Sequence, residues 1–356
     1  MKVYSPEQLE RLISHQPRVR LISAPTPLYP LKNLAAELGL KEILVKRDDL
    51  TGLALGGNKS RKLEFILADA LRQEADTIIT WGSLQSNWCL QTAAAARKCG
   101  LKPVLVLFKT YDLQQIDQGN VLLEKLLGAE IQLRETEKKG KSPDQAQAFR
   151  LLEEAAQVER RKGHKPYLVA VGGSACGGHL EKPLGALAYV LSLLETYRQT
   201  AASGPPDYLV VASGSGGTQA GLLVGARALG LETKIIGICV SDKKEEFLPV
   251  VRQIALDLVE FLGLDLTLEN SDIILLDDYL GAGYGQVTAE VSSVIRLLLQ
   301  KEALVLDPVY TSKAMLGLVD LARKKYFRPG DRVLFLHTGG LPALFAFPDR
   351  LLLKCA

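Results

Sequence analysis

Short, fully apolar segments alternate with helical patterns along most of this 356-residue chain. A strand that is apolar on both faces belongs to a parallel sheet that is covered by helices on both sides. This alternation constrains the fold more than any other feature, and it predicts an α/β protein. The predicted strands are Ile43–Val45, Thr77–Thr80, Val104–Phe108, Ile131–Leu133, Tyr167–Val171, Tyr208–Ala212, Ile235–Val240 and Val333–Leu336.

Helical periodicity separates these strands, and a chain of this length tends to divide into two domains. The predicted helices cover residues 63–71, 92–98, 121–127, 144–162, 184–197 and 218–229. Two such series of strands and helices indicate two α/β domains with a cleft between them. We place a smaller domain at 64–180, inserted into a larger one that comprises 1–63 and 181–356.

Composition excludes several classes of function. The net charge is +3, from 43 basic and 40 acidic side chains, so the chain lacks the basic field of a nucleic-acid-binding protein. It has no stretch of 18 uncharged apolar residues, and nothing is expected to span a membrane. Five widely spaced cysteines without a Cys-x-x-Cys pair indicate neither structural zinc nor a disulfide framework. With no apolar signal region at the N-terminus, the expected location is the cytoplasm.

A lysine stands at the start of one predicted helix, in Gly56-Gly57-Asn58-Lys59-Ser60. Lysine is the side chain that holds an aldehyde cofactor as a Schiff base. A nucleotide P-loop requires glycine directly before the lysine, and here Asn58 intervenes. On local grounds alone, Lys59 is equally well explained as an exposed charge.

A second motif has the composition of a phosphate-binding loop. Ser213-Gly214-Ser215-Gly216-Gly217-Thr218 joins a predicted strand to a predicted helix. The glycines let backbone N–H groups turn toward one point, the hydroxyls add donors, and the helix dipole favours an anion. It is not a dinucleotide fingerprint, because Gln219 stands where glycine or alanine is needed. The alternative is a tight turn without a ligand. Together with Lys59, the loop predicts pyridoxal phosphate.

Further polar residues follow predicted strands, where open α/β sheets bind ligands. Ser86 and Asn87 stand at a helix start, suited to a carboxylate or a phenolic oxygen, although both residues are also preferred N-caps. Thr338 follows the last strand and is better placed for a ligand than His337, which is expected to be a satisfied structural histidine.

Two tyrosines lie in loops that could reach the same cleft. Tyr284 is in the glycine-rich segment 281–285, and Tyr310 is in Asp307-Pro308-Val309-Tyr310-Thr311. Taken singly, either tyrosine is as readily explained by packing.

Jointly and in this order, the motifs resemble those of pyridoxal-phosphate enzymes with the tryptophan-synthase-β fold. The resemblance runs from about residue 20 to 350 and is closest to the branch that contains D-cysteine desulfhydrase and 1-aminocyclopropane-1-carboxylate deaminase. It implies two open, twisted, mostly parallel sheets flanked by helices, with the cofactor in the interdomain cleft. It also implies a small amino-acid substrate and a homodimer.

The resemblance implies a role for each matching position. Lys59 would form the Schiff base and carry the proton at Cα, and Asn87 would bond the cofactor's phenolic oxygen. Ser86 would hold the substrate carboxylate or move a proton. The remaining positions are Ser213, Gly214, Ser215, Gly216, Gly217 and Thr218 for the phosphate, assisted by Lys62, then Tyr284 and Tyr310 facing the substrate, and Thr338 at the pyridine nitrogen.

Two positions separate the branches of this family. Thr311 stands where the deaminase pattern has glutamate, and a neutral hydroxyl near the ring nitrogen weakens the electron sink. This favours β-elimination. Trp88 stands where the family usually has histidine or glutamine, and an indole accepts no proton. Trp88 either forms an apolar wall of the pocket or packs into the core of the small domain.

The function expected from the sequence is β-elimination, with D-cysteine converted to pyruvate, hydrogen sulfide and ammonia. Three alternatives stay open. They are 1-aminocyclopropane-1-carboxylate deamination, β-elimination on another small amino acid such as a β-chloro, O-acetyl or sulfonated alanine, and a cofactor-binding protein with little catalysis.

Overall fold

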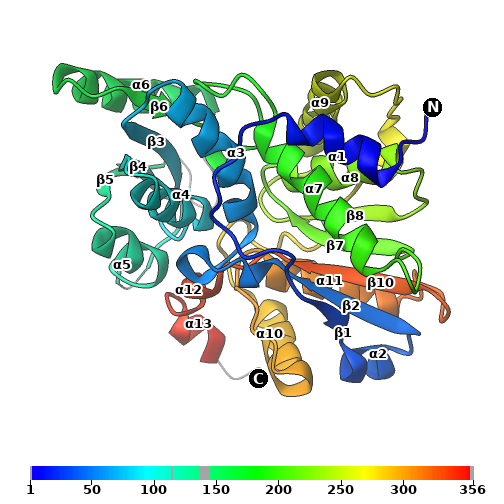
Figure 1. The fold of residues 1–356 in the computed structure, drawn as a ribbon. Coiled ribbons are helices and arrows are strands. Elements are labelled where there is room, and N and C mark those ends of the chain that lie inside the picture. Colours follow the sequence, from blue (N-terminus) through cyan, green and yellow to red (C-terminus); the bar gives the residue numbers. More distant parts are fainter. Residues whose placement is uncertain (1, 114, 137–144, 353–356) are drawn as a thin grey trace.

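Two open sheets, each covered by helices on both faces, form the protein (Figure 1). The structure is a computed structural model that describes residues 2–113, 115–136 and 145–352. The predicted fold class is confirmed. Within the described residues, no helix has both the length and the apolar character needed to cross a membrane. The four cysteines in this part of the chain are free thiols.

In the described residues, the larger sheet has six strands in the order β1-β2-β10-β7-β8-β9. All neighbours pair in parallel except β1, which is antiparallel to β2 at one edge. The strands are β1 (Leu28–Pro30), β2 (Glu42–Arg47), β7 (Tyr208–Ser213), β8 (Lys234–Cys239), β9 (Ile274–Leu276) and β10 (Arg332–His337). The short strands β1 and β9 were not predicted.

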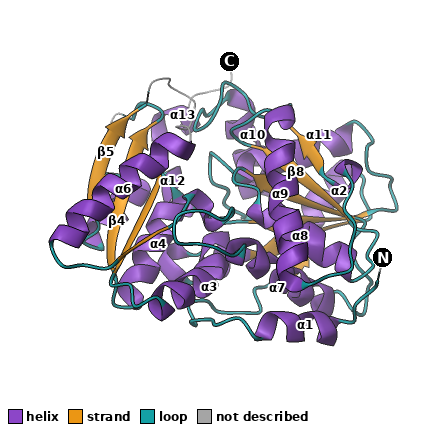
Figure 2. Ribbon diagram, turned by 90° about the horizontal axis from the view of Figure 1, so that it is seen from above, coloured by secondary structure: helices purple, strands orange, loops and turns teal. Residues whose placement is uncertain are grey.

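Alternate residues of the central strands face opposite helical layers, as the pleat of a strand requires. On β10, Leu334 and Leu336 pack toward α1, α7, α8 and α9, whereas Val333 and Phe335 pack toward α2, α10 and α11. Figure 2 shows the layers from above. The helices are α1 (Pro6–Ser14), α2 (Lys32–Leu38), α7 (Leu184–Gln199), α8 (Gly217–Ala228), α9 (Lys244–Leu262), α10 (Ala289–Glu302), α11 (Thr311–Arg323), α12 (Leu341–Leu344) and α13 (Pro348–Leu352).

The smaller sheet is parallel throughout, in the order β5-β4-β3-β6. Helix α6 packs on one face against Ile79 and Val104, and α3 and α4 pack on the other against Ile78 and Leu105. The elements are α3 (Asn58–Arg72), β3 (Thr77–Ser83), α4 (Asn87–Lys98), β4 (Lys102–Lys109), α5 (Gly119–Leu126), β5 (Glu130–Glu135), α6 (Gln145–Arg161) and β6 (Pro166–Leu168).

The strand predicted at Tyr167–Val171 is wrong at its end. Strand β6 ends at Leu168, and Val171–Gly173 is a short 3-10 turn in which Gly172 has a φ of +72°. A left-handed residue of this kind cannot continue a strand. The helix predicted at 144–162 corresponds to α6, and residue 144 lies outside the described residues.

All strands of the smaller sheet fall within 64–180, and those of the larger sheet fall outside it. The proposed boundary at 63/64 nevertheless cuts helix α3, which packs on α7 of the larger layer and on α4 of the smaller one. Residues of all three helices share one hydrophobic cluster. The division into two domains therefore stays a prediction, with α3 belonging to both.

A network of buried charges holds α3 against the larger sheet. Arg61 donates to both carboxylate oxygens of Asp48, at 2.9 and 3.0 Å, and to Glu195, which also pairs with Lys46. Tyr189 donates to Asp48 at 2.7 Å. Burial by itself would raise the pKa of Glu195, but the hydrogen bond from Arg61 and the two cationic charges outweigh it and lower this pKa to about 2.

We expect Arg61→Met to lower the free energy of unfolding by about 3–5 kcal/mol, because it leaves the fully buried Asp48 without its cation. Urea unfolding measures this. Arg198→Met is the matched control: its pair with Glu10 is roughly half exposed, and its loss should cost less than about 1 kcal/mol. Equal, small losses in both variants would contradict the structural importance of the network.

Candidate active site

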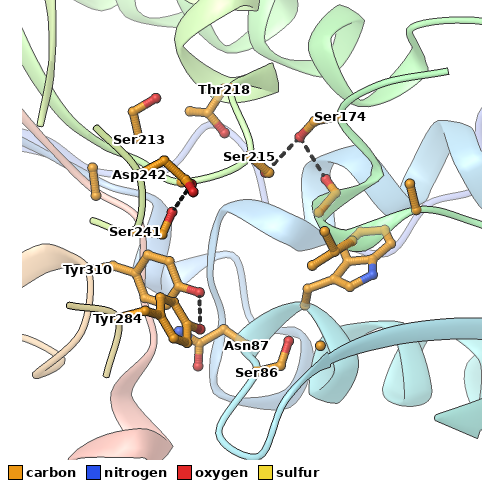
Figure 3. A pocket seen from close by; sticks show the side chains of 18 of the residues that line it. Ser86, Asn87, Ser174, Ser213, Ser215, Thr218, Ser241, Asp242, Tyr284 and Tyr310 are labelled. Atoms are coloured by element: carbon orange, nitrogen blue, oxygen red, sulfur yellow. Dashed lines mark hydrogen bonds between the residues drawn. The ribbon is translucent and has the colours of Figure 1, made fainter. Parts of the chain in front are cut away.

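A cavity of about 310 Å³ opens between the two layers, beyond the carboxyl ends of β3, β7, β8 and β10 (Figure 3). This is where ligands bind in open α/β sheets. Most of the residues predicted from the sequence line it together, namely Lys59, Ser86, Asn87, Ser213, Gly214, Ser215, Gly216, Thr218, Tyr284, Tyr310 and Thr338. The other two predicted residues, Lys62 and Gly217, lie behind the cavity wall and do not line the cavity.

Lys59 is in the first turn of α3, and neighbouring segments fix this turn. The backbone N–H of Asn58 donates to the Thr338 carbonyl at 3.0 Å, and the Asn58 amide donates to the Thr218 hydroxyl at 3.1 Å. Gly57 has a φ of +135°, and a Cβ there would lie 2.2 Å from the Gln91 amide nitrogen. Only glycine allows the chain to enter the helix this closely.

The Lys59 amine faces the cavity without a carboxylate to pair with. The side chain is partly exposed, and burial of the amine is what lowers the pKa of Lys59 to about 8. Among the described residues, no hydrogen bond or ion pair engages this amine. A cation without a partner in such a place costs free energy, so the neutral, nucleophilic form is reached at a lower pH than for an exposed lysine. Lys59 thus lines the cavity and is not a fully exposed surface charge.

The glycine-rich loop leads directly into α8. Gly216, with a φ of +80°, precedes the helix and offers no side-chain cap. In the described part of the chain, no hydrogen bond uses the backbone N–H groups of Ser215, Gly216 or Thr218. The Ser213 hydroxyl is also buried without a partner. Unsatisfied donors at a helix N-terminus form a site for an anion such as phosphate.

Lys62 contacts this loop only through a serine that the sequence analysis missed. Its amine donates to the Gly172 carbonyl at 3.1 Å and to the Ser174 hydroxyl at 2.9 Å, and that hydroxyl bonds the Ser215 hydroxyl at 2.8 Å (Figure 3). Burial, and then the charge of Lys59, lower the pKa of Lys62 well below its ordinary value. Gly172-Gly173-Ser174 follows β6, so the same pattern of glycine and hydroxyl after a strand was the available signal.

Gly217 is needed because α8 passes against Ser174. A Cβ at Gly217 would lie 2.7 Å from the Ser174 hydroxyl oxygen. The glycine therefore shapes the loop without touching the cavity.

Ser86 and Asn87 serve both as a helix start and as cavity wall. The Ser86 hydroxyl accepts from the Cys89 N–H at 3.2 Å, which is an N-cap, and both side chains line the cavity. The side-chain oxygen of Asn87 accepts a hydrogen bond from the side-chain amide of Asn120 at 2.8 Å. Capping and cavity lining are thus compatible, as the sequence analysis allowed.

Three hydroxyls form a row that crosses the cleft. The Ser83 hydroxyl, at the end of β3, bonds the Tyr284 hydroxyl at 3.0 Å. The Tyr284 hydroxyl in turn bonds the Tyr310 hydroxyl at 2.6 Å (Figure 3). Burial is the main cause that raises the pKa of Tyr284, and burial next to Tyr284 raises that of Tyr310 well above its ordinary value. Both phenols stay neutral and able to donate. Ser83 was not singled out from the sequence, although it follows Gly82 at a strand end.

Trp88 agrees with both alternatives that the sequence left open, since it packs in the core and also forms part of the pocket wall. Its indole N–H donates to the Thr80 hydroxyl at 2.7 Å, and the ring belongs to the main hydrophobic cluster. The side chain also lines the cavity. Because the indole N–H is already used, Trp88 presents an apolar surface to a ligand.

Thr311 does not stand where the sequence analysis placed it. Its hydroxyl donates to the Asp307 carboxylate at 2.7 Å, and Thr311 is not part of the cavity wall, whereas Thr338 is. What remains of the argument is that position 311 carries no carboxylate.

His337 is a satisfied structural residue as predicted, with Nε2 2.7 Å from the Val305 carbonyl and Nδ1 accepting from the Gly339 N–H.

Comparison with known proteins identifies the class of protein. The model of the pyridoxal-phosphate-dependent enzyme family matches residues 19–339, and the chain belongs to this family.

Relatives and a solved structure cover almost the whole chain. D-cysteine desulfhydrase of Serratia proteamaculans is 44% identical over 95% of this chain and 98% of its own length. A putative 1-aminocyclopropane-1-carboxylate deaminase of Pyrococcus furiosus is 42% identical over 97% and 98%. The crystal structure of a homologue of 1-aminocyclopropane-1-carboxylate deaminase superposes with a TM-score of 0.84, at 38% identity, over 97% of this chain and 98% of that one.

The residues of the cavity fit pyridoxal phosphate. The free Lys59 amine matches its aldehyde, and the unsatisfied N–H groups of the loop before α8 match its phosphate. The partnerless Ser213 hydroxyl lies at the same end of the cavity wall as that loop. The identity of the individual site residues stays a prediction.

The apoprotein should capture pyridoxal phosphate faster as pH rises, with a midpoint near pH 8 and a plateau at higher pH. Only the neutral amine attacks an aldehyde, and the pKa of Lys59 is lowered from 10.5 to about 8. Stopped-flow absorbance after mixing apoprotein with cofactor measures the rate. Lys59→Arg, which keeps the charge and cannot form the bond, is the control. A midpoint near 10.5 would show that the amine is not desolvated.

Proposed function

We propose that the protein catalyses β-elimination on a small amino acid and converts D-cysteine to pyruvate, hydrogen sulfide and ammonia. The observation that carries this proposal is the unpaired Lys59 amine, which shares a cavity with the neutral Tyr284 and Tyr310 hydroxyls. A base and proton donors in one enclosed space are what an elimination needs. The relative in Serratia proteamaculans, named D-cysteine desulfhydrase, supports the choice of substrate.

Bound pyridoxal phosphate supplies an electron sink for the negative charge that develops at Cα. The protein has to remove the proton there, and Lys59 is the group placed to do so. A base whose pKa is about 8 is half neutral near ordinary pH, which suits both taking up and returning a proton. Lys59 therefore holds the cofactor before the substrate arrives and carries the Cα proton afterwards.

The N-terminus of α4 is suited to the substrate carboxylate. Ser86 caps this helix and lines the cavity, so its hydroxyl and the helix dipole face the same space. The departing sulfur needs a proton, and the Tyr310 hydroxyl, held by Tyr284, is the neutral donor for it. Trp88 adds an apolar wall that keeps water from part of the cavity.

A second candidate is deamination of 1-aminocyclopropane-1-carboxylate. It is favoured by the relative in Pyrococcus furiosus and by the similar crystal structure. This reaction breaks a carbon–carbon bond and has no leaving group to assist, so it places a greater demand on the electron sink. Position 311 carries no carboxylate, but it lies outside the cavity wall and does not decide between the two reactions. Other β-substituted alanines, and cofactor binding with little catalysis, are the remaining alternatives.

We also propose a cytoplasmic homodimer, and a small domain at 64–180 inserted between 1–63 and 181–356. Exposed apolar side chains on two neighbouring helices support an interface: Leu122 and Leu126 on α5, and Phe345 beside α12. Light scattering of the purified protein tests the dimer, and a monomer at micromolar concentration would refute it.

Purified protein should be yellow and should release equal amounts of sulfide and pyruvate from D-cysteine. Lys59→Ala removes the base and the attachment point, and we expect turnover to fall by about 10³-fold or more. Coupled assays of pyruvate and sulfide measure the reaction. Release of 2-oxobutyrate from 1-aminocyclopropane-1-carboxylate, with none from D-cysteine, would favour the deaminase. Cofactor bound without turnover of D- and L-amino acids would favour a binding protein.

Tyr310→Phe should lower kcat for D-cysteine by about 10²-fold with little change in KM, since it removes a proton donor and keeps the ring. Tyr279→Phe is the matched control. Its hydroxyl bonds Asp320 at 2.6 Å outside the cavity wall, and its loss should leave both parameters nearly unchanged. Steady-state assays decide. If Tyr310→Phe keeps full kcat, the sulfur receives its proton from another group.

A further inference from the structure

Asn120 lies behind the cavity wall and contacts a residue that lines it. It is fully buried in the first turn of α5 and takes no part in the wall. Its amide nitrogen donates to two acceptors, the Gln85 backbone carbonyl at 2.9 Å and the Asn87 side-chain oxygen at 2.8 Å. Asn120 therefore connects α5 with the start of α4.

The Gln85 carbonyl decides which way the Asn120 amide points. A backbone carbonyl only accepts, so the end of Asn120 that faces it must be the NH₂ group. The same NH₂ group faces Asn87, which must then present its oxygen. The oxygen of Asn120 itself has no partner in the described part of the chain, so no competing donor favours the flipped orientation of this amide.

The orientation of Asn87 follows from this chain of contacts. With its oxygen held by Asn120, its NH₂ group is left for the cavity, and no hydrogen bond among the described residues occupies that nitrogen. A Cβ at Gly340 would lie 2.6 Å from it, so glycine at this position leaves the nitrogen unobstructed. A donor, rather than an acceptor, is thus directed at a bound group.

Hydrogen bonds with Gln85 hold the first turn of α5 in place, which restricts the rotation of the Asn120 side chain. Its backbone N–H donates to the Gln85 side-chain oxygen at 2.7 Å, and the Gln85 amide donates to the Gln118 carbonyl at 2.9 Å. The Gln85 backbone N–H is tied to the Tyr111 hydroxyl at 3.1 Å. A Cβ at Gly119 would lie 2.4 Å from the Gln85 side-chain oxygen, so glycine at the residue before Asn120 allows this close contact.

We propose that Asn120 is a positioning residue that sets the Asn87 amide with its NH₂ group toward the phenolic oxygen of pyridoxal phosphate, and thereby stabilises the deprotonated form of that oxygen. This inference rests on the proposed contact between Asn87 and the cofactor. It does not depend on which amino acid is the substrate.

The test is the pH midpoint at which the visible absorbance band of the holoenzyme titrates in the absence of substrate. Asn120→Asp replaces the donor with an acceptor, so Asn87 turns and offers its oxygen to the cofactor. We expect the midpoint to rise by about one pH unit, the size of a lost hydrogen bond to a charged group. Asn120→Ala removes the donor with little strain and should shift the midpoint less, in the same direction. If Asn120→Asp does not fold, the shift of the midpoint in Asn120→Ala tests the proposal.

A double-mutant cycle separates positioning from other effects. Asn87→Ala should raise the midpoint by itself, and Asn120→Asp added to it should give no further rise. A further rise would show a direct effect of the new charge and would overturn the proposal. So would an unchanged midpoint in an Asn120→Asp or Asn120→Ala protein that binds the cofactor.

Gln85→Leu is the matched structural control. It loosens the same turn of α5 but keeps the Gln85 carbonyl and the Asn120 amide, so the melting temperature should fall while the midpoint stays. An equal shift in this variant would show that Asn120 is merely structural. If D-cysteine proves not to be a substrate, the proposed function fails and this titration still reports on Asn120.

Discussion

The buried ion network of Asp48, Arg61, Glu195 and Lys46 is the constraint on which the site depends. Charges removed from water at this depth are tolerated only when every partner is in place, so the network permits few alternative positions for the segments that carry it. Asp48 follows β2, Arg61 is in α3 and Glu195 is in α7. The start of α3 is therefore fixed against the larger sheet, and with it the residue that precedes Arg61 by two positions, Lys59.

Helix α3 shows how position on one helix changes the chemistry of a cation. Arg61 faces carboxylates, and their charges outweigh its burial and raise its pKa well above the ordinary value. Lys59 and Lys62, on other sides of the same turn, have amines that are removed from water without a carboxylate beside them, and both pKa values are lowered. A permanently charged arginine and a lysine that loses its proton more easily than usual thus lie within three residues. The helix separates the two tasks by direction, since residues two apart do not face each other.

The sequence revealed those features that are local, and missed those that depend on contacts between distant segments. Central strands such as β7 and β10 were predicted because their apolar runs are buried on both faces, whereas the three-residue edge strands β1 and β9 carry no such run. Most site residues that follow predicted strands were found, but Ser83 and Ser174 were not. Asn120 was missed because it acts on Asn87, more than thirty positions away, and no local pattern marks it. Ser174 also acts on a distant residue, Ser215, but the segment Gly172-Gly173-Ser174 after β6 was a local signal. Thr311 was misplaced because a motif gives its neighbours in sequence and not the direction of its hydroxyl.

The row of hydroxyls makes the packing between the two sheets part of the chemistry. Ser83 is on the smaller sheet, whereas Tyr284 and Tyr310 belong to segments that follow β9 in the larger half, so the bond between Ser83 and Tyr284 crosses the cleft. Ser86 and Asn87 come from the same half as Ser83, at the N-terminus of α4, and Lys59 comes from the helix that both halves share. A shift of the smaller sheet would therefore move Ser86, Asn87 and one end of the hydroxyl row together. The shared hydrophobic cluster around α3, α4 and α7 opposes such a shift, and this is why a core that merges the two halves suits a site built from both.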